Sequence, residues 1–297
     1  MQTYTLPIVA RKMIINADDF GLTEGVNRAV EQAHTQGVLT SATIMPNMPA
    51  AEQAVEIAKN LPGLGVGVHL NLTDGRPLSE AQSVAILLSR DGGFCWPPGK
   101  LALKSLLNKE VREAIRTELA AQIEWVVDRG IKPTHLDSHK HIHAFPPIFS
   151  IVCGLAKRFD IKAVRWSYEP RNICSPPWPF TSVASRKRAS IVRKMALINR
   201  RQNSRFLKTD ALLGIAHTGK INQSFWRVVA RYGDNQPPVV EVMTHPGYTE
   251  GLEAADTRLI KQRKVELDAL CSERTRAFLS DTGMALVHYG QLENESD

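Results

Sequence analysis

The chain has 297 residues and a net charge of +7, and 43% of its residues are hydrophobic. This composition excludes wholesale disorder, and the length suits a single α/β barrel, so we expect one domain over residues 1–297. The N-terminal stretch MQTYTLPIVARKMIIN lacks the pattern of a signal peptide, and no apolar run approaches the roughly 20 residues that cross a bilayer. We expect a cytoplasmic protein, with peripheral contact at the inner membrane face as a further option.

The first half of the chain alternates apolar runs with helical patterns. The run KMIINADDFG starts apolar and ends in acids and glycine, which is typical of a buried strand with a polar carboxyl end. The predicted strands are 12–21, 38–47 and 64–73, the predicted helices are 24–37, 49–63 and 109–129, and the predicted long loop is 74–108.

The second half continues the same alternation. The predicted strands are 133–143, 161–167, 210–217, 238–247 and 284–290, and the predicted helices are 146–159, 223–233 and 256–281. Regular alternation of strands and helices favours a parallel α/β architecture. Seven or eight such units in one chain of this length predict a distorted TIM-like (β/α) barrel with seven or eight parallel strands.

A basic insertion at about 172–208 interrupts the alternation. Its part 185–208 contains nine Lys and Arg residues and no acid, so it carries +9 and the rest of the chain carries a net −2. Apolar residues recur there at helical spacing, namely Ile191, Val192, Met195 and Ile198. This pattern suits a basic amphipathic helix on an anionic membrane, or a solvated helix with its apolar side on the barrel. Nucleic-acid binding is not expected, because interleaved aromatic residues are missing.

The four cysteines lie far apart and form no CxxC pair: Cys95, Cys153, Cys174 and Cys271. We expect reduced, structural thiols, as in a cytoplasm.

Polar residues suited to a reactive site lie at the ends of most of the predicted strands. They are Asp18 and Asp19, His69, the histidines His139, His141 and His143, Arg165, and His245. Active sites of (β/α) barrels form at the carboxyl ends of the strands. We therefore expect these side chains to share one site.

The stretch PTHLDSHKHIH has a histidine or an aspartate at every second position. Residues two apart in a strand share a face, so His135, Asp137, His139, His141 and His143 are expected on one side. We expect one of these histidines to bind a metal and the others to make supporting hydrogen bonds. The pattern alone does not say which histidine is the ligand.

One carboxylate and two imidazoles suit a divalent metal with open positions for water, and zinc and magnesium are both compatible. Asp18 and Asp19 can divide the work, because one can hold the metal while the other takes a proton from water. Arg165 would keep that base ionised, and His245 would act as general acid. The set predicts metal-assisted hydrolysis of an acyl bond.

Four blocks of the chain resemble the signature blocks of YdjC-like carbohydrate deacetylases, in the same order: NADDFGLTEGVNRAV, GVGVHLNLTDGRPL, PTHLDSHKHIH and VMTHPGY. The resemblance implies a distorted barrel with one divalent metal ion, Mg²⁺ being favoured and Zn²⁺ the alternative. The residues at matching positions are the metal ligands Asp19, His69 and His139, the base Asp18 and the acid His245. The implied reaction removes an N-acetyl group from an amino sugar and releases acetate.

The basic insertion is similar to the arginine-rich region of the hopanoid-associated branch of that family, which implies a glycolipid such as hopanoid-linked N-acetylglucosamine. The alternatives are another single-metal hydrolase on the same barrel and a non-catalytic sugar-binding or membrane-associated barrel. Trp96, Trp166, Trp178 and Tyr248 are candidates for stacking on sugar rings, with core packing as the alternative for each. The oligomeric state is not readable from the sequence, and a homodimer is one option.

Overall fold

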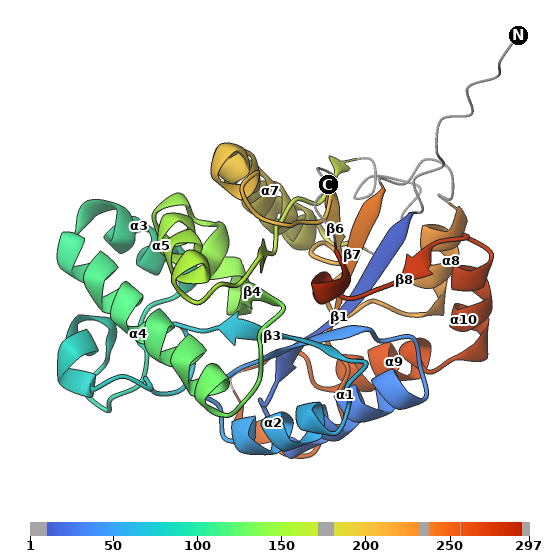
Figure 1. The fold of residues 1–297 in the computed structure, drawn as a ribbon, viewed down its shortest axis with the longest axis horizontal. Helices are drawn as coiled ribbons and strands as arrows, with labels where there is room; N and C mark the ends of the chain where they lie inside the picture. Colours follow the sequence, from blue (N-terminus) through green and yellow to red (C-terminus); the bar gives the residue numbers. More distant parts are fainter. Residues whose placement is uncertain (1–10, 172–180, 232–237, 256, 293–297) are drawn as a thin grey trace, which may run out of the picture.

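The computed structural model describes residues 11–171, 181–231, 238–255 and 257–292. Parallel strands occupy its centre (Figure 1). They are β1 (Lys12–Phe20), β2 (Ser41–Ile44), β3 (Gly65–Leu70), β4 (His135–Ser138), β5 (Ala163–Val164), β6 (Ala211–Leu213), β7 (Val239–Thr244) and β8 (Ala285–Leu286).

The strand order is β5-β4-β3-β2-β1-β7-β6, and β8 pairs with the start of β1. The sheet curls, so that its two edges come close to each other. Ala163 in β5 forms a bridge with Leu207, and the Leu212 N–H in β6 donates to the Tyr168 carbonyl at 2.9 Å. The parallel, curled sheet confirms the predicted distorted TIM-like barrel with seven or eight strands.

Helices surround the sheet, with α3, α4 and α5 on one side of Figure 1 and α8 and α10 on the other. The α-helices are α1 (Glu24–Thr35), α2 (Ala51–Lys59), α3 (Pro98–Leu107), α4 (Lys109–Asp128), α5 (Pro146–Arg158), α7 (Val183–Asn203), α8 (Gln223–Arg231), α9 (Lys261–Leu270) and α10 (Glu273–Ser280). The 3-10 segments are η1 (Ala81–Leu87), η2 (His139–Ala144), η4 (Leu252–Ala254) and η5 (Tyr289–Gln291).

Buried apolar side chains of β1 to β4 and the helices around them form the main core. In β3, Gly67 makes room for a neighbouring imidazole, because a Cβ at this position would lie 2.5 Å from the ring of His135. That ring stacks on Tyr289 with 3.9 Å between ring centroids. Gly67 therefore serves packing in a central strand.

The prediction of one strand over 133–143 is wrong beyond Ser138. β4 ends there, and η2 follows, with Lys140 and His141 in the left-handed region at φ 53°. The turn directs His141 and His143 away from the row formed by His135 and Asp137. The five side chains therefore do not share one strand face.

Other boundaries also differ from the predictions. The predicted loop 74–108 contains η1 and α3, and the predicted helix 256–281 is broken into α9 and α10. The break occurs at Ser272, whose side chain accepts a hydrogen bond from the Arg274 N–H and so caps a new helix. The basic insertion forms α7, while residues 172–180, with Cys174 and Trp178, lie outside the described residues.

Cys95, Cys153 and Cys271 are free thiols. Among the helices that the structure describes, none has the length and apolar character to traverse a bilayer.

Candidate active site

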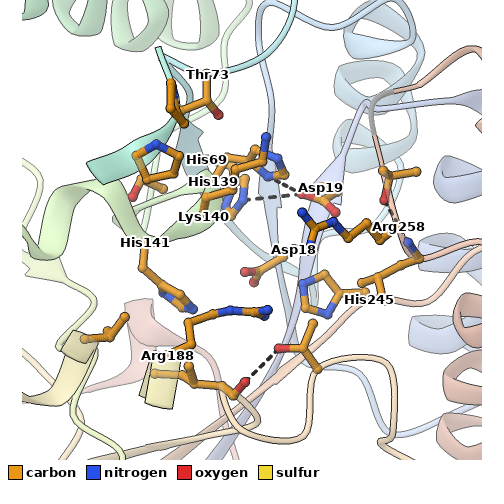
Figure 2. Close-up of a pocket in the computed structure, with 18 of the residues that line it drawn as sticks. Asp18, Asp19, His69, Thr73, His139, Lys140, His141, Arg188, His245 and Arg258 are labelled. Atoms are coloured by element: carbon orange, nitrogen blue, oxygen red, sulfur yellow. Dashed lines mark hydrogen bonds and ion pairs between the residues drawn. The ribbon is translucent and has the colours of Figure 1, made fainter. Parts of the chain in front are cut away.

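A pocket of about 720 Å³ lies at the carboxyl ends of the strands. Asp18, Asp19, His69, His139 and His245 all line it, so five of the six predicted site residues come together (Figure 2). The carboxyl ends of β1, β3 and β7 supply four of these side chains, and the start of η2 supplies His139. The expected convergence at one end of the barrel is thus present.

A bulge in β1 lets two consecutive aspartates face the same pocket. In a regular strand, Asp18 and Asp19 would point to opposite faces. Between Ala17 and Phe20, β1 advances three residues while β2 advances two, and Asp19 has a φ of 66°. Such a bulge re-aims side chains next to a functional site, and here both carboxylates line the pocket.

Asp19 has one anchored and one available oxygen. Arg263 donates to its Oδ2 at 2.5 Å, while Oδ1 lies 2.9 Å from His139 Nδ1 and 3.5 Å from His69 Nε2. In Figure 2 both imidazoles approach this carboxylate (dashed lines). Burial would raise the pKa of Asp19, but the charges of Arg263 and His139 outweigh it and hold the pKa well below the ordinary value.

Each of the two histidines is oriented from behind by a second carboxylate. His69 Nδ1 lies 2.8 Å from Asp137 Oδ1, and His139 Nε2 lies 3.0 Å from Asp74 Oδ2. Carboxylates placed in this way fix the tautomer and ring orientation of metal-binding histidines. The remaining ring nitrogens, His69 Nε2 and His139 Nδ1, both face Asp19.

The donor set of Asp19, His69 and His139 fits a divalent ion, because their ligand atoms lie within 4.8 Å of one another. The His139 side chain keeps 17% exposure, which leaves access from the pocket. Asp137 and Asp18 outweigh the opposing effect of burial and raise the pKa of His69 to about 10. Ligation requires a neutral imidazole, so the affinity of this set for a cation is expected to rise with pH.

A second cluster, formed by Asp18, His69 and Asp137, also brings three donor atoms together. Its carboxylates are already neutralised, since Arg165 lies 2.7 Å from Asp18 and 2.6 Å from Asp137. It also shares His69 with the first set. The first set is therefore the better candidate for one metal ion.

Arg165 is fully buried and lies behind Asp18. Its Nη1 and Nη2 donate to the two oxygens of Asp18 at 2.9 and 2.7 Å, and it also binds Asp137 and Glu241. Burial alone would raise the pKa of Asp18, but the charges of Arg165 and His69 lower it. Arg165 follows β5 and is outside the pocket lining, so an oxyanion in the pocket does not meet its guanidinium directly.

His245 follows β7 and lines the pocket with most of its ring buried. Burial lowers the pKa of this imidazole to about 4, with smaller opposing effects from Asp19 and Asp18. Its Nδ1 lies 3.9 Å from Glu266 Oε2, and the same carboxylate accepts the His245 backbone N–H at 2.7 Å. Glu266 thus positions this residue from α9.

The other cluster histidines are held by hydrogen bonds. His143 contacts Ser138 Oγ and the Arg165 carbonyl, and His141 lines the pocket with Nδ1 at 3.4 Å from Ser167 Oγ. The His135 ring is buried away from the pocket, and Thr134 Oγ1 lies 3.0 Å from its Nδ1.

Of the described aromatic residues considered for stacking on sugar rings, one lines the pocket and two do not. Trp96 lines the pocket, whereas Trp166 is buried, stacks on Tyr168 and donates to the Ala196 carbonyl at 3.1 Å. Tyr248 is outside the pocket lining, with its hydroxyl bound to Gln32.

Several residues that shape the site were not predicted from the sequence: Asp74, Arg188, Glu241, Arg258, Arg263 and Glu266. Glu241 could have been noticed in the sequence, because it is a charged residue inside the apolar run VVEVM of β7. Arg263 and Glu266 gave no such signal, because the sequence of α9 is highly charged and resembles that of a solvated surface helix.

The class that these features define is a (β/α) barrel with a carboxylate–imidazole site at the carboxyl ends of its strands. The family model described as YdjC-like protein matches residues 12–281. The chain belongs to this family.

Curated relatives extend over nearly the whole chain. A carbohydrate deacetylase of Brevibacillus brevis is 37% identical over 281 residues, covering 95% of this chain and 99% of the relative. A carbohydrate deacetylase of Geobacillus stearothermophilus is 34% identical, covering 95% and 98%. Among solved structures, an Enterococcus faecalis protein assigned to cellobiose-phosphate cleavage has a TM-score of 0.71 over 94% of this chain and 98% of its own. At 24% identity it supports the fold alone.

Proposed function

We propose that the protein is a metal-dependent carbohydrate deacetylase, which hydrolyses the N-acetyl amide of an amino sugar to acetate and a free amine. The observation that carries the proposal is the adjacency of two differently held carboxylates. Asp19 faces two imidazoles, and the positive charge of the buried Arg165 keeps Asp18 in its ionised form. The relatives named carbohydrate deacetylases support the substrate class.

Asp19, His69 and His139 would hold the metal ion. A divalent ion bound there supplies a Lewis acid for the acyl oxygen and lowers the pKa of a water molecule next to it. Mg²⁺ is the proposed ion on the basis of the family resemblance, and the two imidazoles also suit Zn²⁺.

Asp18 would accept a proton from the attacking water. Its carboxylate is ionised by Arg165, and Asn16 Nδ2 donates to its Oδ1 at 2.9 Å, so it is available as a base in a fixed orientation. The water oxygen adds to the carbonyl carbon, the C–N bond then breaks, and the leaving nitrogen gains a proton.

His245 would deliver that proton to the leaving nitrogen. The ring is neutral in the free protein, so it must first gain the proton that Asp18 takes from the water. The negative charge that develops on the acyl group favours this transfer, because it raises the pKa of the imidazole. Glu266 accepts the backbone N–H of His245 at 2.7 Å and so holds this residue in place at the end of β7.

The proposal extends to a glycolipid form of the substrate, including a hopanoid-linked N-acetylglucosamine, in a single-domain protein of the cytoplasm. Support for the lipid comes from the basic helix α7, which supplies Arg188, Ile191 and Val192 to the pocket wall. A phosphoesterase with two metal ions has less support, because the second carboxylate cluster is occupied by Arg165 and shares His69.

The test is acetate release from N-acetylglucosamine oligosaccharides and from an N-acetylglucosaminyl lipid, with and without a chelator. Acetate must appear with at least one substrate, stop with the chelator and return when a divalent ion is added. Turnover that persists in full after removal of all metal would overturn the proposed metal dependence.

A further inference from the structure

Two rows of side chains alternate along the exposed face of α7. Taken together, successive members of the two rows are three or four residues apart, which is the spacing of one helix face. The apolar row is Val183, Ile191 and Ile198, and the basic row is Lys187, Lys194 and Arg201. The three apolar residues are 74%, 46% and 63% exposed, so the helix presents an alternating apolar and cationic stripe to solvent.

The stripe is not needed to attach the helix to the barrel. The opposite face of α7 packs Ala189, Val192 and Ala196 into a small core with residues of β6 and β7. Asn199 Nδ2 adds a hydrogen bond to the Ala144 carbonyl at 2.8 Å. Since burial of the other face holds the helix, the exposed apolar side chains call for a different explanation.

The charge of the stripe is not balanced nearby. Residues 185–208 contain no Asp or Glu, although they carry nine positive charges. Within the described ranges of the chain, Lys187, Lys194 and Arg201 form no ion pair with a carboxylate. The surface is therefore complementary to an anionic partner.

A second acid-free helix lies close to the same pocket. Helix α3 exposes Leu103, Leu106 and Leu107 beside Lys100 and Lys104. Of the eleven large hydrophobic side chains that are exposed in the described part of the chain, seven belong to α3 and α7. Both helices pack against α5, which lies between them in Figure 1.

The stripe is continuous with the pocket. Ile191 belongs to the stripe and also lines the pocket, and Arg188, one turn before Val192, points into it (Figure 2). Helix α3 begins at Pro98, which lines the same pocket. A flat partner on these helices would therefore lie next to the pocket opening.

We propose that the outer face of α7, together with α3, binds the surface of an anionic lipid bilayer and brings the pocket opening to it. Lys and Arg side chains attract anionic headgroups, and isolated aliphatic side chains between them enter the interface. The phosphates of a nucleic acid would bind the basic row but would leave the apolar row exposed to water, so a bilayer fits the stripe better. A consequence, which rests on the proposed function, is that the amino sugar is presented as the headgroup of a membrane lipid.

The binding test uses the full chain and sedimenting vesicles. Vesicles of phosphatidylcholine with roughly 30 mol% phosphatidylglycerol should bind about tenfold more protein than vesicles of phosphatidylcholine alone, and high salt should reduce that binding. The double variant K187E/K194E should lose the preference for anionic vesicles. The variant V183S/I198S should weaken binding while it retains the full positive charge, because the interfacial contacts are removed.

A matched control is K132E/K157E, which changes the charge equally near the amino-terminal edge of the sheet, away from the pocket. It should bind vesicles like the parent. Acetate release from a soluble oligosaccharide should be unchanged in K187E/K194E, because neither lysine lines the pocket. This readout separates failure of membrane binding from failure of the deacetylase proposal.

Three results would overturn the membrane proposal: equal binding to neutral and anionic vesicles, undiminished binding of K187E/K194E, or capture of duplex DNA or RNA in preference to anionic vesicles.

Discussion

Arg165 holds both oxygens of Asp18, at 2.7 and 2.9 Å, from a position without solvent exposure. The same guanidinium also binds Asp137, which in turn orients the imidazole of His69. One buried cation thus connects the proposed base with the proposed metal ligands, because it binds both Asp18 and the carboxylate that contacts His69.

Arg165→Lys tests this connection. The lysine keeps the charge but loses the planar pair of donors, so Asp18 is less well oriented and its pKa rises. Since the carboxylate is the active form, the acid limb of the kcat/KM profile should move to higher pH, and kcat should fall about 100-fold. Acetate release measured across pH checks this.

The control for that substitution is Arg158→Lys, at an exposed pair with Glu124, where the same chemical change should leave the profile alone. An acid limb that stays in place in Arg165→Lys would show that this arginine does not set the ionisation of the base.

Asp74→Asn should weaken metal binding without loss of the fold. Asp74 accepts from His139 Nε2 and also pairs with Lys140, and removal of a carboxylate behind a ligand histidine typically costs 10- to 100-fold in metal affinity. Titration of metal-free protein by calorimetry measures the change.

The matched control is Asp128→Asn at the exposed end of α4, and Lys140→Met removes the lysine contact but keeps the carboxylate. Both should retain nearly full metal affinity. An Asp74→Asn protein that binds metal like the parent would remove this residue from the account.

Parts of this site follow from the sequence by general rules, while others do not. Asp18, His69 and His245 were predictable because each follows an apolar run and barrels gather strand ends at one face. The left-handed turn at Lys140 and His141 could not be predicted, because an alternating pattern of residues indicates that the strand continues. Glu266 and Arg263 reach the site from a helix distant in sequence, and only the tertiary packing of α9 shows it.

Glu266→Gln should change how stability depends on pH. Burial raises the pKa of Glu266 to about 7 from an ordinary 4.5, so the folded protein holds this proton more tightly than the unfolded chain. The resulting stabilisation is complete below about pH 4.5 and is lost as pH rises through 7. The parent should therefore lose stability relative to Glu266→Gln over that window, by at most roughly 3 kcal/mol.

Urea unfolding of both proteins at several pH values between 4.5 and 8 measures the difference. A constant difference across this range would mean that Glu266 keeps an ordinary pKa in the folded protein.

The central claim is that Asp18 acts on the proton while Asp19, His69 and His139 hold the metal. The most direct measurement is acetate release by Asp18→Asn, made on protein whose bound metal is quantified in the same sample. We expect Asp18→Asn to lose turnover with one ion still bound per chain, and His139→Ala to lose the ion itself. Full turnover by Asp18→Asn, with its metal retained, would contradict the account.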